Sequence, residues 1–244
     1  MEYKIIKPCT ALAPYIHSFW ELKGEDNDKQ WERNFPDGCA GLVVNIGDTC
    51  ATDNGSVRMD FGKTYVVGAM TSFKDSFIDA DAHLLGVCLK PGVFRNFYNY
   101  VTQNEITDQT IQLEKRYSFD LDKVIKNPVD YLNTFFVNRL QKRNEHLQTI
   151  IEAIDHAKGQ LSIDEIARMN FTTVRQLERT FKAETGISPK AYSCIIRFQH
   201  ALSRIKNSDP NESLFDIALE CGYYDHAHLT NEIKRNTGLV PSQL

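Results

Sequence analysis

The apolar residues in the first part of the chain come in short runs that alternate with turn-forming residues. The runs are rich in β-branched and aromatic side chains, and Gly, Pro, Asn and Asp stand between them. Several short strands at this spacing are typical of a β-sandwich or barrel. The expected strands are Ala40–Ile46, Thr64–Val67 and Leu84–Leu89. After them, Val93–Val101 has helical character, and we expect no strand beyond it.

From about Pro128 to the end, apolar residues recur at the three- and four-residue spacing of amphipathic helices. Pro128 suits the first turn of one such helix. The next helix is expected to place on one face Leu147, Ile150, Ile151 and Ile154. The short charged link Lys142–Glu145 between these helices is the candidate boundary. The pattern therefore predicts an α+β protein of two domains, residues 1–141 and 142–244.

Two segments of the helical part, residues 161–189 and 212–241, repeat one order of features. Each begins with a serine cap and a short helix containing an Ile-Ala pair, and passes through a tight connection into a second amphipathic helix. Each ends with Thr-Gly-hydrophobic-x-Pro, in which Gly supplies a left-handed helix end. This order predicts two helix-turn-helix units, whose second helices can enter the major groove of DNA. An ordinary bundle with two helical hairpins is the alternative, and the matching copies disfavour it.

The second helix of the first copy presents candidate base-reading residues. From its cap at Thr173, Val174, Leu177 and Phe181 are expected to face inward. The opposite face carries, at helical spacing, Arg175, Glu178, Arg179 and Lys182. Arginine grips the O6 and N7 atoms of guanine, and glutamate accepts from the amino group of cytosine. A solvated face with a Glu178–Lys182 ion pair is the alternative interpretation.

The corresponding face of the second copy is less basic. It carries His226, Ala227, His228, Asn231 and Arg235. Asparagine can read adenine and alanine can contact the methyl group of thymine, so we expect weaker or more sequence-tolerant reading there. Between the copies, Pro189–Ile205 is expected to form a long helix that holds the two reading helices about one DNA turn (~34 Å) apart.

The distribution of charge constrains this interpretation. The composition, 42% hydrophobic and 25% charged, is that of a globular protein, and the formal net charge is −4. Residues 1–141 contain 15 Lys and Arg against 19 Asp and Glu, whereas residues 142–244 contain 13 of each. The helical part therefore lacks the basic excess that is usual for a nucleic-acid binder. A DNA-binding face must arise there from local placement of charge.

Candidate residues for catalysis or metal binding are few. Residues 1–141 contain only two histidines, His17 and His83, and the six cysteines form no CxxC pair. No nucleophile motif or phosphate-binding glycine loop occurs. We therefore expect no enzymatic activity, no cofactor and no metal. The sequence also shows no signal peptide and no apolar run of membrane-spanning length, which predicts a cytoplasmic protein with reduced cysteines.

Residues 145–244 resemble the AraC family of bacterial transcription regulators, whose DNA-binding domain has two helix-turn-helix units joined by a linker helix. The segments that carry the resemblance are IARMNFTTVRQLERTFKAETGISPKAY, RFQHAL and IALECGYYDHAHLTNEIKRNTGLVPSQL. The resemblance implies base contacts from Arg175, Glu178, Arg179, His226, Ala227, His228 and Asn231. We further predict phosphate contacts from Thr173, Lys182, Lys234 and Arg235. The family often has Arg at the position of Asn231 and an aromatic residue at that of Ile233.

The first part more loosely resembles the cupin-like sensor domains that precede such units. The resemblance rests on ALAPYIHSFW, FPDGCAGLVVNIGD, VVGAM and GVCLKPGVF. It implies a β-rich, cupin-like barrel with helices that binds a small-molecule effector or mediates homodimerisation, with RNA polymerase as a further partner of an activator. The predicted pocket residues are Trp20 and Trp31. The cluster Phe94, Phe97, Tyr98 and Tyr100 is open to three roles: pocket, interface or core. A domain that only docks to another protein is the alternative.

Overall fold

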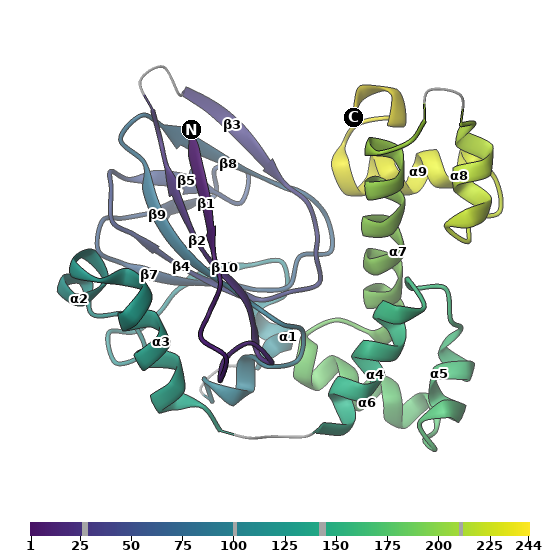
Figure 1. Ribbon diagram of the computed structural model, residues 1–244, viewed down its shortest axis with the longest axis horizontal. Helices are drawn as coiled ribbons and strands as arrows, with labels where there is room; N and C mark the ends of the chain where they lie inside the picture. Colours follow the sequence, from purple (N-terminus) through teal and green to yellow (C-terminus); the bar gives the residue numbers. More distant parts are fainter. Residues whose placement is uncertain (26–28, 100–101, 142–144, 210–211) are drawn as a thin grey trace.

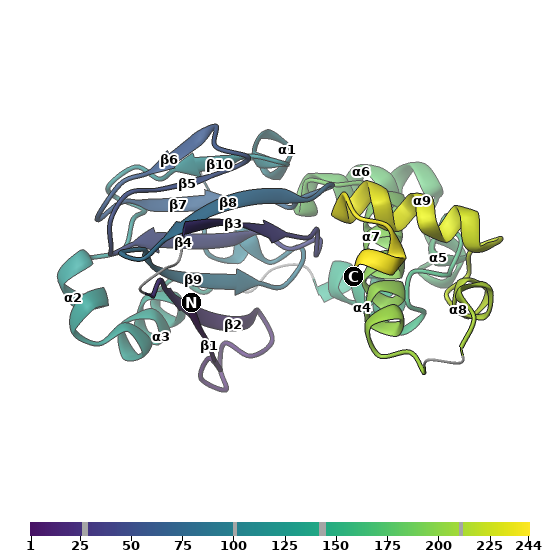
Figure 2. The ribbon, with the colours of Figure 1, turned by 90° about the horizontal axis from the view of Figure 1, so that it is seen from above.

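The computed structural model describes residues 1–25, 29–99, 102–141, 145–209 and 212–244. Two parts lie side by side, a β-rich part from β1 to α3 and a helical part from α4 to η2 (Figures 1 and 2). The expected architecture of a β-rich first part followed by helices is confirmed. No helix of the described residues is long and apolar enough to cross a membrane.

The β-rich part contains two antiparallel sheets. The six-stranded sheet has the order β1 (Glu2–Ile6), β2 (Ile16–Lys23), β9 (His83–Leu89), β4 (Gly41–Asn45), β7 (Thr64–Val67), β10 (Thr110–Gln112). The four-stranded sheet has the order β3 (Lys29–Asn34), β8 (Lys74–Asp79), β5 (Cys50–Thr52), β6 (Val57–Met59). The three strands predicted from apolar runs correspond to β9, β4 and β7, which are consecutive in this sheet with β4 in the middle.

The six-stranded sheet is covered on both faces, which explains why its central strands read as unbroken apolar runs. Along β4, Leu42 and Val44 face a core shared with helices α2 (Leu121–Lys126) and α3 (Pro128–Arg139). Val43, between them, joins a second core with residues of the four-stranded sheet. Because consecutive side chains of a strand point to opposite faces, a strand between two cores has no polar face.

The structure corrects two expectations for the segment that follows β9. The predicted helix at Val93–Val101 is a single 3-10 turn, η1 (Phe94–Asn96), and Tyr100 and Val101 lie outside the described residues. Phe94, Phe97 and Tyr98 are buried in the core beneath the six-stranded sheet, so one turn suffices to direct all three rings inward. The second error is β10, which follows the short helix α1 (Gln103–Ile106) and pairs with β7.

The helical part matches the predicted elements closely. Helix α4 (Glu145–His156) is followed by α5 (Ile163–Met169), α6 (Val174–Thr185), α7 (Pro189–Lys206), α8 (Leu214–Glu220), α9 (His226–Thr237) and the 3-10 turn η2 (Pro241–Gln243). The cap side chains of Ser162, Thr173 and Ser213 accept from backbone N–H groups, and Gly186 and Gly238 have the left-handed conformation. The periodic apolar residues and their caps therefore determine these helices locally.

Helix α7 separates two small cores. Its first half packs with α4, α5 and α6, the last two of which we call the first pair. Its second half packs with α8 and α9, the second pair. Of the four residues predicted to be buried along α7, Tyr192, Ala201 and Leu202 are buried and Ile196 is half-buried. The two pairs therefore sit at opposite ends of one continuous helix (Figure 1).

Candidate nucleic-acid interface and ligand cavity

The two pairs are built alike and present equivalent helices. In each, Leu and the large apolar residue four positions later are fully buried, namely Leu177 and Phe181 in α6 and Leu229 and Ile233 in α9. A constant offset of 52 residues relates α6 to α9, so Arg179 is equivalent to Asn231 and Lys182 to Lys234. The turn before the second helix is residues 170–173 in the first pair and 221–225 in the second, one residue longer.

The predicted reading faces are exposed in both pairs. In α6 the exposed residues are Arg175, Glu178, Arg179 and Lys182; in α9 they are His226, Ala227, His228, Asn231, Lys234 and Arg235. Thr173, the predicted phosphate contact, is the exposed cap of α6. Whether these side chains contact DNA stays a prediction, but the fold leaves each of them accessible.

Local contacts order two of the arginines. The Arg179 guanidinium donates to Gln176 Oε1 at 2.6 Å, which holds it along the helix. Arg235 forms an ion pair with Glu232 at 3.1 Å. The two helices also differ at the cap, which is the neutral Thr173 in α6 and the acidic Asp225 in α9. The reading face of α6 is therefore more positive than that of α9.

The β-rich part holds the C-terminal ends of both reading helices. Beside α6, Thr107 Oγ1 donates to the carbonyl of Gly186 at 3.0 Å, and Arg95 pairs with Glu184 at 3.0 Å. Beside α9, Arg33 donates to the carbonyl of Thr237 at 2.9 Å. The bonds from Thr107 and Arg33 satisfy carbonyl groups that a helix end leaves free. All three contacts lie at the C-terminal ends and leave the N-terminal turns of α6 and α9 open to a ligand.

Arg33 is itself fixed on three sides. It makes a two-pronged ion pair with Asp75, at 2.7 and 2.9 Å, and its guanidinium lies 4.2 Å from the centre of the Phe73 ring. The hydrogen bond to Asp75 raises the pKa of Arg33 and lowers that of Asp75. A planar guanidinium held in this way is a rigid support for the end of α9.

A third contact joins the loop between β3 and β4 to α7. Gln199 donates to the carbonyl of Pro36 at 2.6 Å, and the rings of Phe35 and Phe198 meet edge to face at 6.5 Å. Gly38 lies against the ring of Tyr192 with no room for a β-carbon. The loop therefore forms one wall of the junction between the two parts.

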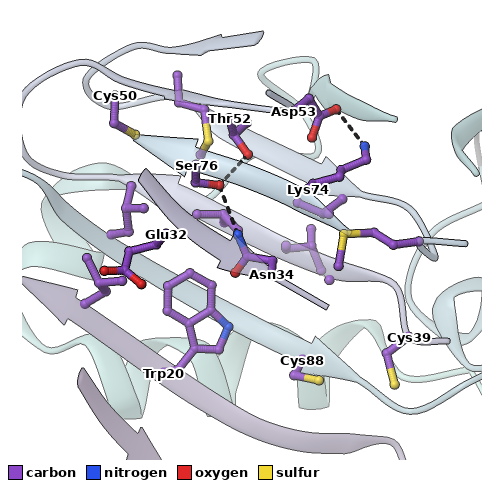
Figure 3. A pocket seen from close by; sticks show the side chains of 18 of the residues that line it. Trp20, Glu32, Asn34, Cys39, Cys50, Thr52, Asp53, Lys74, Ser76 and Cys88 are labelled. Atoms are coloured by element: carbon purple, nitrogen blue, oxygen red, sulfur yellow. Dashed lines mark hydrogen bonds and ion pairs between the residues drawn. The ribbon is translucent and has the colours of Figure 1, made fainter. Parts of the chain in front are cut away.

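A cavity of about 200 Å³ lies between the two sheets and reaches this same loop. Its lining from the six-stranded sheet is mainly apolar and includes Trp20, Leu42 and Val43. The four-stranded sheet and its turns contribute polar side chains, among them Glu32, Asn34, Thr52, Asp53, Lys74 and Ser76 (Figure 3). A ligand there would meet one apolar wall and one wall of hydrogen-bonding groups.

Polar groups on this wall already bond to one another. Ser76 is within hydrogen-bond distance of Thr52 at 2.8 Å and of Asn34 at 3.1 Å. Lys74, only 10% exposed, pairs with Asp53 at 2.9 Å. Because Asp53 compensates the charge of Lys74, this pair offers hydrogen bonds rather than a net charge.

The two predicted pocket residues fall in different places. Trp20 lines the cavity, whereas Trp31 is 52% exposed and packs edge to face on Phe77. The alternation of β3 explains the difference, because Glu32 and Asn34 point into the cavity and their neighbour Trp31 points away. Sequence reasoning missed the polar wall, because a strand such as β8, KDSFID, carries no apolar run.

The two histidines singled out from the sequence have ordinary structural roles. His83 Nε2 lies 2.8 Å from Glu21 Oε1 at the end of two paired strands, and His17 is exposed. Cys50 is buried in the cavity wall, where desolvation raises its pKa to about 11. A hydrogen bond with Cys88, burial and the nearby Asp37 also raise the pKa of Cys39.

Comparison with known proteins assigns the helical part. A family model described as a helix-turn-helix domain matches residues 166–244, and one described as a domain of unknown function (DUF6597) matches residues 4–112. The transcriptional activator RhaS of Klebsiella pneumoniae is 30% identical over 37% of this chain and 32% of its own length. The urease operon transcriptional activator of Escherichia coli is 27% identical over 56% of this chain and 45% of its own length.

Solved structures match the whole chain. ToxT from Vibrio cholerae aligns with a TM-score of 0.53 over 99% of this chain and 96% of its own, at 10% identity. ToxT with a bound unsaturated fatty acid aligns with a TM-score of 0.52. The matches to the curated relatives span about a third to a half of their length. The helical part is therefore similar to the helix-turn-helix domains of these activators, and the two-part fold is similar to that of ToxT.

Proposed function

We propose that this protein is a sequence-specific regulator of transcription that binds double-stranded DNA through α6 and α9. The observation that carries the proposal is the duplicated pair: two equivalent helices, each with its apolar face buried and its predicted reading face exposed, at opposite ends of α7. Helices held in this manner can enter successive stretches of the major groove. The activators RhaS and the urease operon regulator, which the helical part resembles, support the same role.

In this proposal the residues have divided roles. Arg175, Glu178 and Arg179 read bases from α6, and His226, Ala227, His228 and Asn231 do so from α9. The contacts to phosphate come from Thr173, Lys182, Lys234 and Arg235. Residues 1–141 and 142–244 act as a regulatory and a DNA-binding domain, and the protein has no enzymatic role. Homodimerisation, and contact with RNA polymerase at an activated promoter, belong to the same proposal.

The regulatory ligand is expected to occupy the cavity between the sheets. The cavity is smaller than the usual ligand pocket of about 300–1,000 Å³, so the ligand is small. ToxT has been solved with an unsaturated fatty acid. Here Asp53 already neutralises the charge of Lys74, so this lysine offers no free positive charge to a carboxylate. We therefore propose a neutral molecule with an apolar body and a hydroxyl or amide group.

The decisive experiment is selection of random duplex DNA by the full-length protein at about 100 mM salt. We expect an enriched motif of two short blocks separated by about one helical turn, roughly 10 base pairs. A motif of one block would restrict base reading to one pair. If no sequence is enriched, with or without small neutral molecules present, the proposal fails in favour of a protein-docking role.

The cavity is tested separately by thermal unfolding in the presence of small neutral alcohols and amides. A ligand that binds only the folded state raises the unfolding temperature in a saturable manner. Thr52→Phe, which places a ring in the cavity from β5, should abolish this shift, whereas Ala11→Phe on an exposed loop should preserve it. A shift that persists in Thr52→Phe would place the ligand elsewhere.

A further inference from the structure

Two cysteines and a carboxylate meet at one end of the cavity. Asp37 and Cys39 belong to the loop between β3 and β4, and Cys88 belongs to β9. Their two sulfur atoms and one carboxylate oxygen all lie within 4.8 Å of one another. Figure 3 shows Cys39 and Cys88 side by side, with Cys50 apart from them on the other sheet.

The register of the sheet and one turn bring these groups together. Gly41 on β4 pairs with Cys88, and Cys39 precedes Gly41 by two residues, so the two thiols are diagonal neighbours. Gly38 has a φ of +73°, which reverses the chain between Asp37 and Cys39. The Cys39 N–H then donates to Asp37 Oδ1 at 2.9 Å and fixes the carboxylate beside the sulfur.

The distances among the two sulfur atoms and the carboxylate oxygen suit a single metal ion that prefers sulfur ligands. With bonds of about 2.3 Å to sulfur and about 2.0–2.2 Å to oxygen, the ligand atoms of a tetrahedral site lie roughly 3.5–3.8 Å apart. Thiolates select Zn²⁺ over Mg²⁺ or Ca²⁺. We propose that Asp37, Cys39 and Cys88 form a Zn²⁺-binding site, with a fourth position for water or another donor.

The position of the site connects it to the helical part. Pro36 and Gly38, on either side of Asp37, contact Gln199 and Tyr192 of α7. Tyr192 in turn donates to Asp155 of α4 at 2.8 Å. An ion held by Asp37 and Cys39 therefore braces the loop that touches the helix joining the two pairs.

The sequence gives no sign of this site. Cys39 and Cys88 are 49 positions apart and lack the close spacing of a zinc-binding motif. The expectation that the protein binds no metal rested on that spacing. Strand pairing supplies the proximity that the sequence does not display.

The test uses the purified full-length protein after removal of metal by a chelator. Titration with Co²⁺ should give one bound ion per chain and the charge-transfer absorption of a cobalt–thiolate bond, and Zn²⁺ should displace it. Cys39→Ser and Cys88→Ser should each weaken the band and reduce Zn²⁺ affinity more than about 100-fold, because loss of an outer-shell partner alone costs about 10–100-fold, and the double variant should lose the band. Asp37→Asn should keep the thiolate band and bind more weakly.

The controls are the other two cysteines of the β-rich part. Cys9→Ser and Cys50→Ser should bind Co²⁺ like the parent, with the same band. In the parent protein, Zn²⁺ should also protect Cys39 and Cys88 from alkylation, a readout that requires no variant to fold. Absence of a thiolate band in the parent, or a band that survives when Cys39→Ser and Cys88→Ser are combined, overturns the proposal.

The site does not depend on the proposed regulation of transcription. DNA affinity, measured on the same metal-free preparation in the presence of the chelator, reports on α6 and α9 alone. A protein that binds DNA but no Zn²⁺ would refute only the metal site, and one that binds Zn²⁺ but no DNA would refute only the proposed function.

Discussion

The first and second pairs share a backbone design but differ in the chemistry of the face that each offers to DNA. Both have a capped short helix, a tight turn, a buried Leu and a glycine end. On the exposed face, Arg175 and Arg179 of α6 are replaced in α9 by Ala227 and Asn231. The two pairs therefore share the residues that make the fold, whereas the residues predicted to read bases differ between them.

The two pairs are also held by the β-rich part in different ways. In the first pair Thr107 and Arg95 hold the end of α6, whereas in the second Arg33 holds the end of α9 and Phe35 packs against the core. The end of α6 is therefore bonded to two side chains of the β-rich part, and the end of α9 to Arg33, beside the Phe73 ring. We expect the first pair to have the stronger reading face as well.

The largest expected effect is on base reading by α6. Arg179→Ala should weaken binding to the selected DNA by about 1–3 kcal/mol and relax the preference at one base pair. The reason is that the change removes the bidentate contact between arginine and guanine. The equivalent change in the second pair, Asn231→Ala, should cost less. The measurement is a titration of labelled duplexes that carry each base at the contacted position.

A gain-of-function change sharpens the same point. Asn231→Arg places at α9 the residue found at the equivalent position of α6, and should tighten binding to duplexes with guanine in the second block. Equal losses from Arg179→Ala and Asn231→Ala would contradict the difference between the two faces.

Loss of a predicted phosphate contact should weaken DNA binding by similar amounts in the two pairs, because Lys182 and Lys234 occupy equivalent positions. Each change to Ala should weaken binding to selected and random DNA alike, and lower the slope of log affinity against log salt by about one unit. Titrations at several salt concentrations measure that slope. A loss confined to selected DNA would instead assign that lysine to base reading.

The third effect concerns support of the second pair. Arg33→Ala removes the bond to the Thr237 carbonyl and leaves Asp75 without its partner, so we expect a loss of about 1 kcal/mol in the free energy of unfolding. Hydrogen exchange should rise in α8 and α9 but not in α5 and α6. Arg58→Ala, which removes an exposed ion pair with Asp60, is the control and should be nearly neutral.

The sequence predicted what local patterns determine. The caps Ser162, Thr173 and Ser213 and the glycine ends act within a few residues of their own helices, and the apolar runs of β4, β7 and β9 reflect burial on both faces. These signals were sufficient for the two-part fold and for the exposed reading faces.

The features that sequence reasoning missed depend on pairings between distant residues. Strand β3, KQWERN, has no apolar run, and only its pairing with β8 reveals that Asn34 points into the cavity and Trp31 away from it. The bond from Arg33 to Thr237 joins residues 204 positions apart. No local pattern of charge or hydrophobicity signals such a contact, and so neither the cavity wall nor the support of α9 was predicted.

The smallest expected effect is a pH dependence confined to the second pair. His200 of α7 lies 3.4 Å from the Cys221 sulfur at the end of α8. Burial lowers the pKa of His200, nearby Lys158 and Arg204 lower it further, and Glu220 opposes them. The folded protein thus favours the neutral ring. This stabilisation is fully present above the ordinary histidine pKa of about 6.5 and is lost as the pH falls through the lower folded value.

His200→Gln should remove this dependence, because glutamine is neutral at every pH and can retain a hydrogen-bonding group near Cys221. Thermal unfolding of the parent and the variant between about pH 5 and 8, with hydrogen exchange to locate the change, provides the measurement. The stabilities of the two proteins should diverge in the parent's disfavour as the pH falls below about 6.5, with faster exchange in α8. A gap between the two proteins that stays constant with pH, or a loss located in α5 and α6, would show that protonation does not distinguish the pairs.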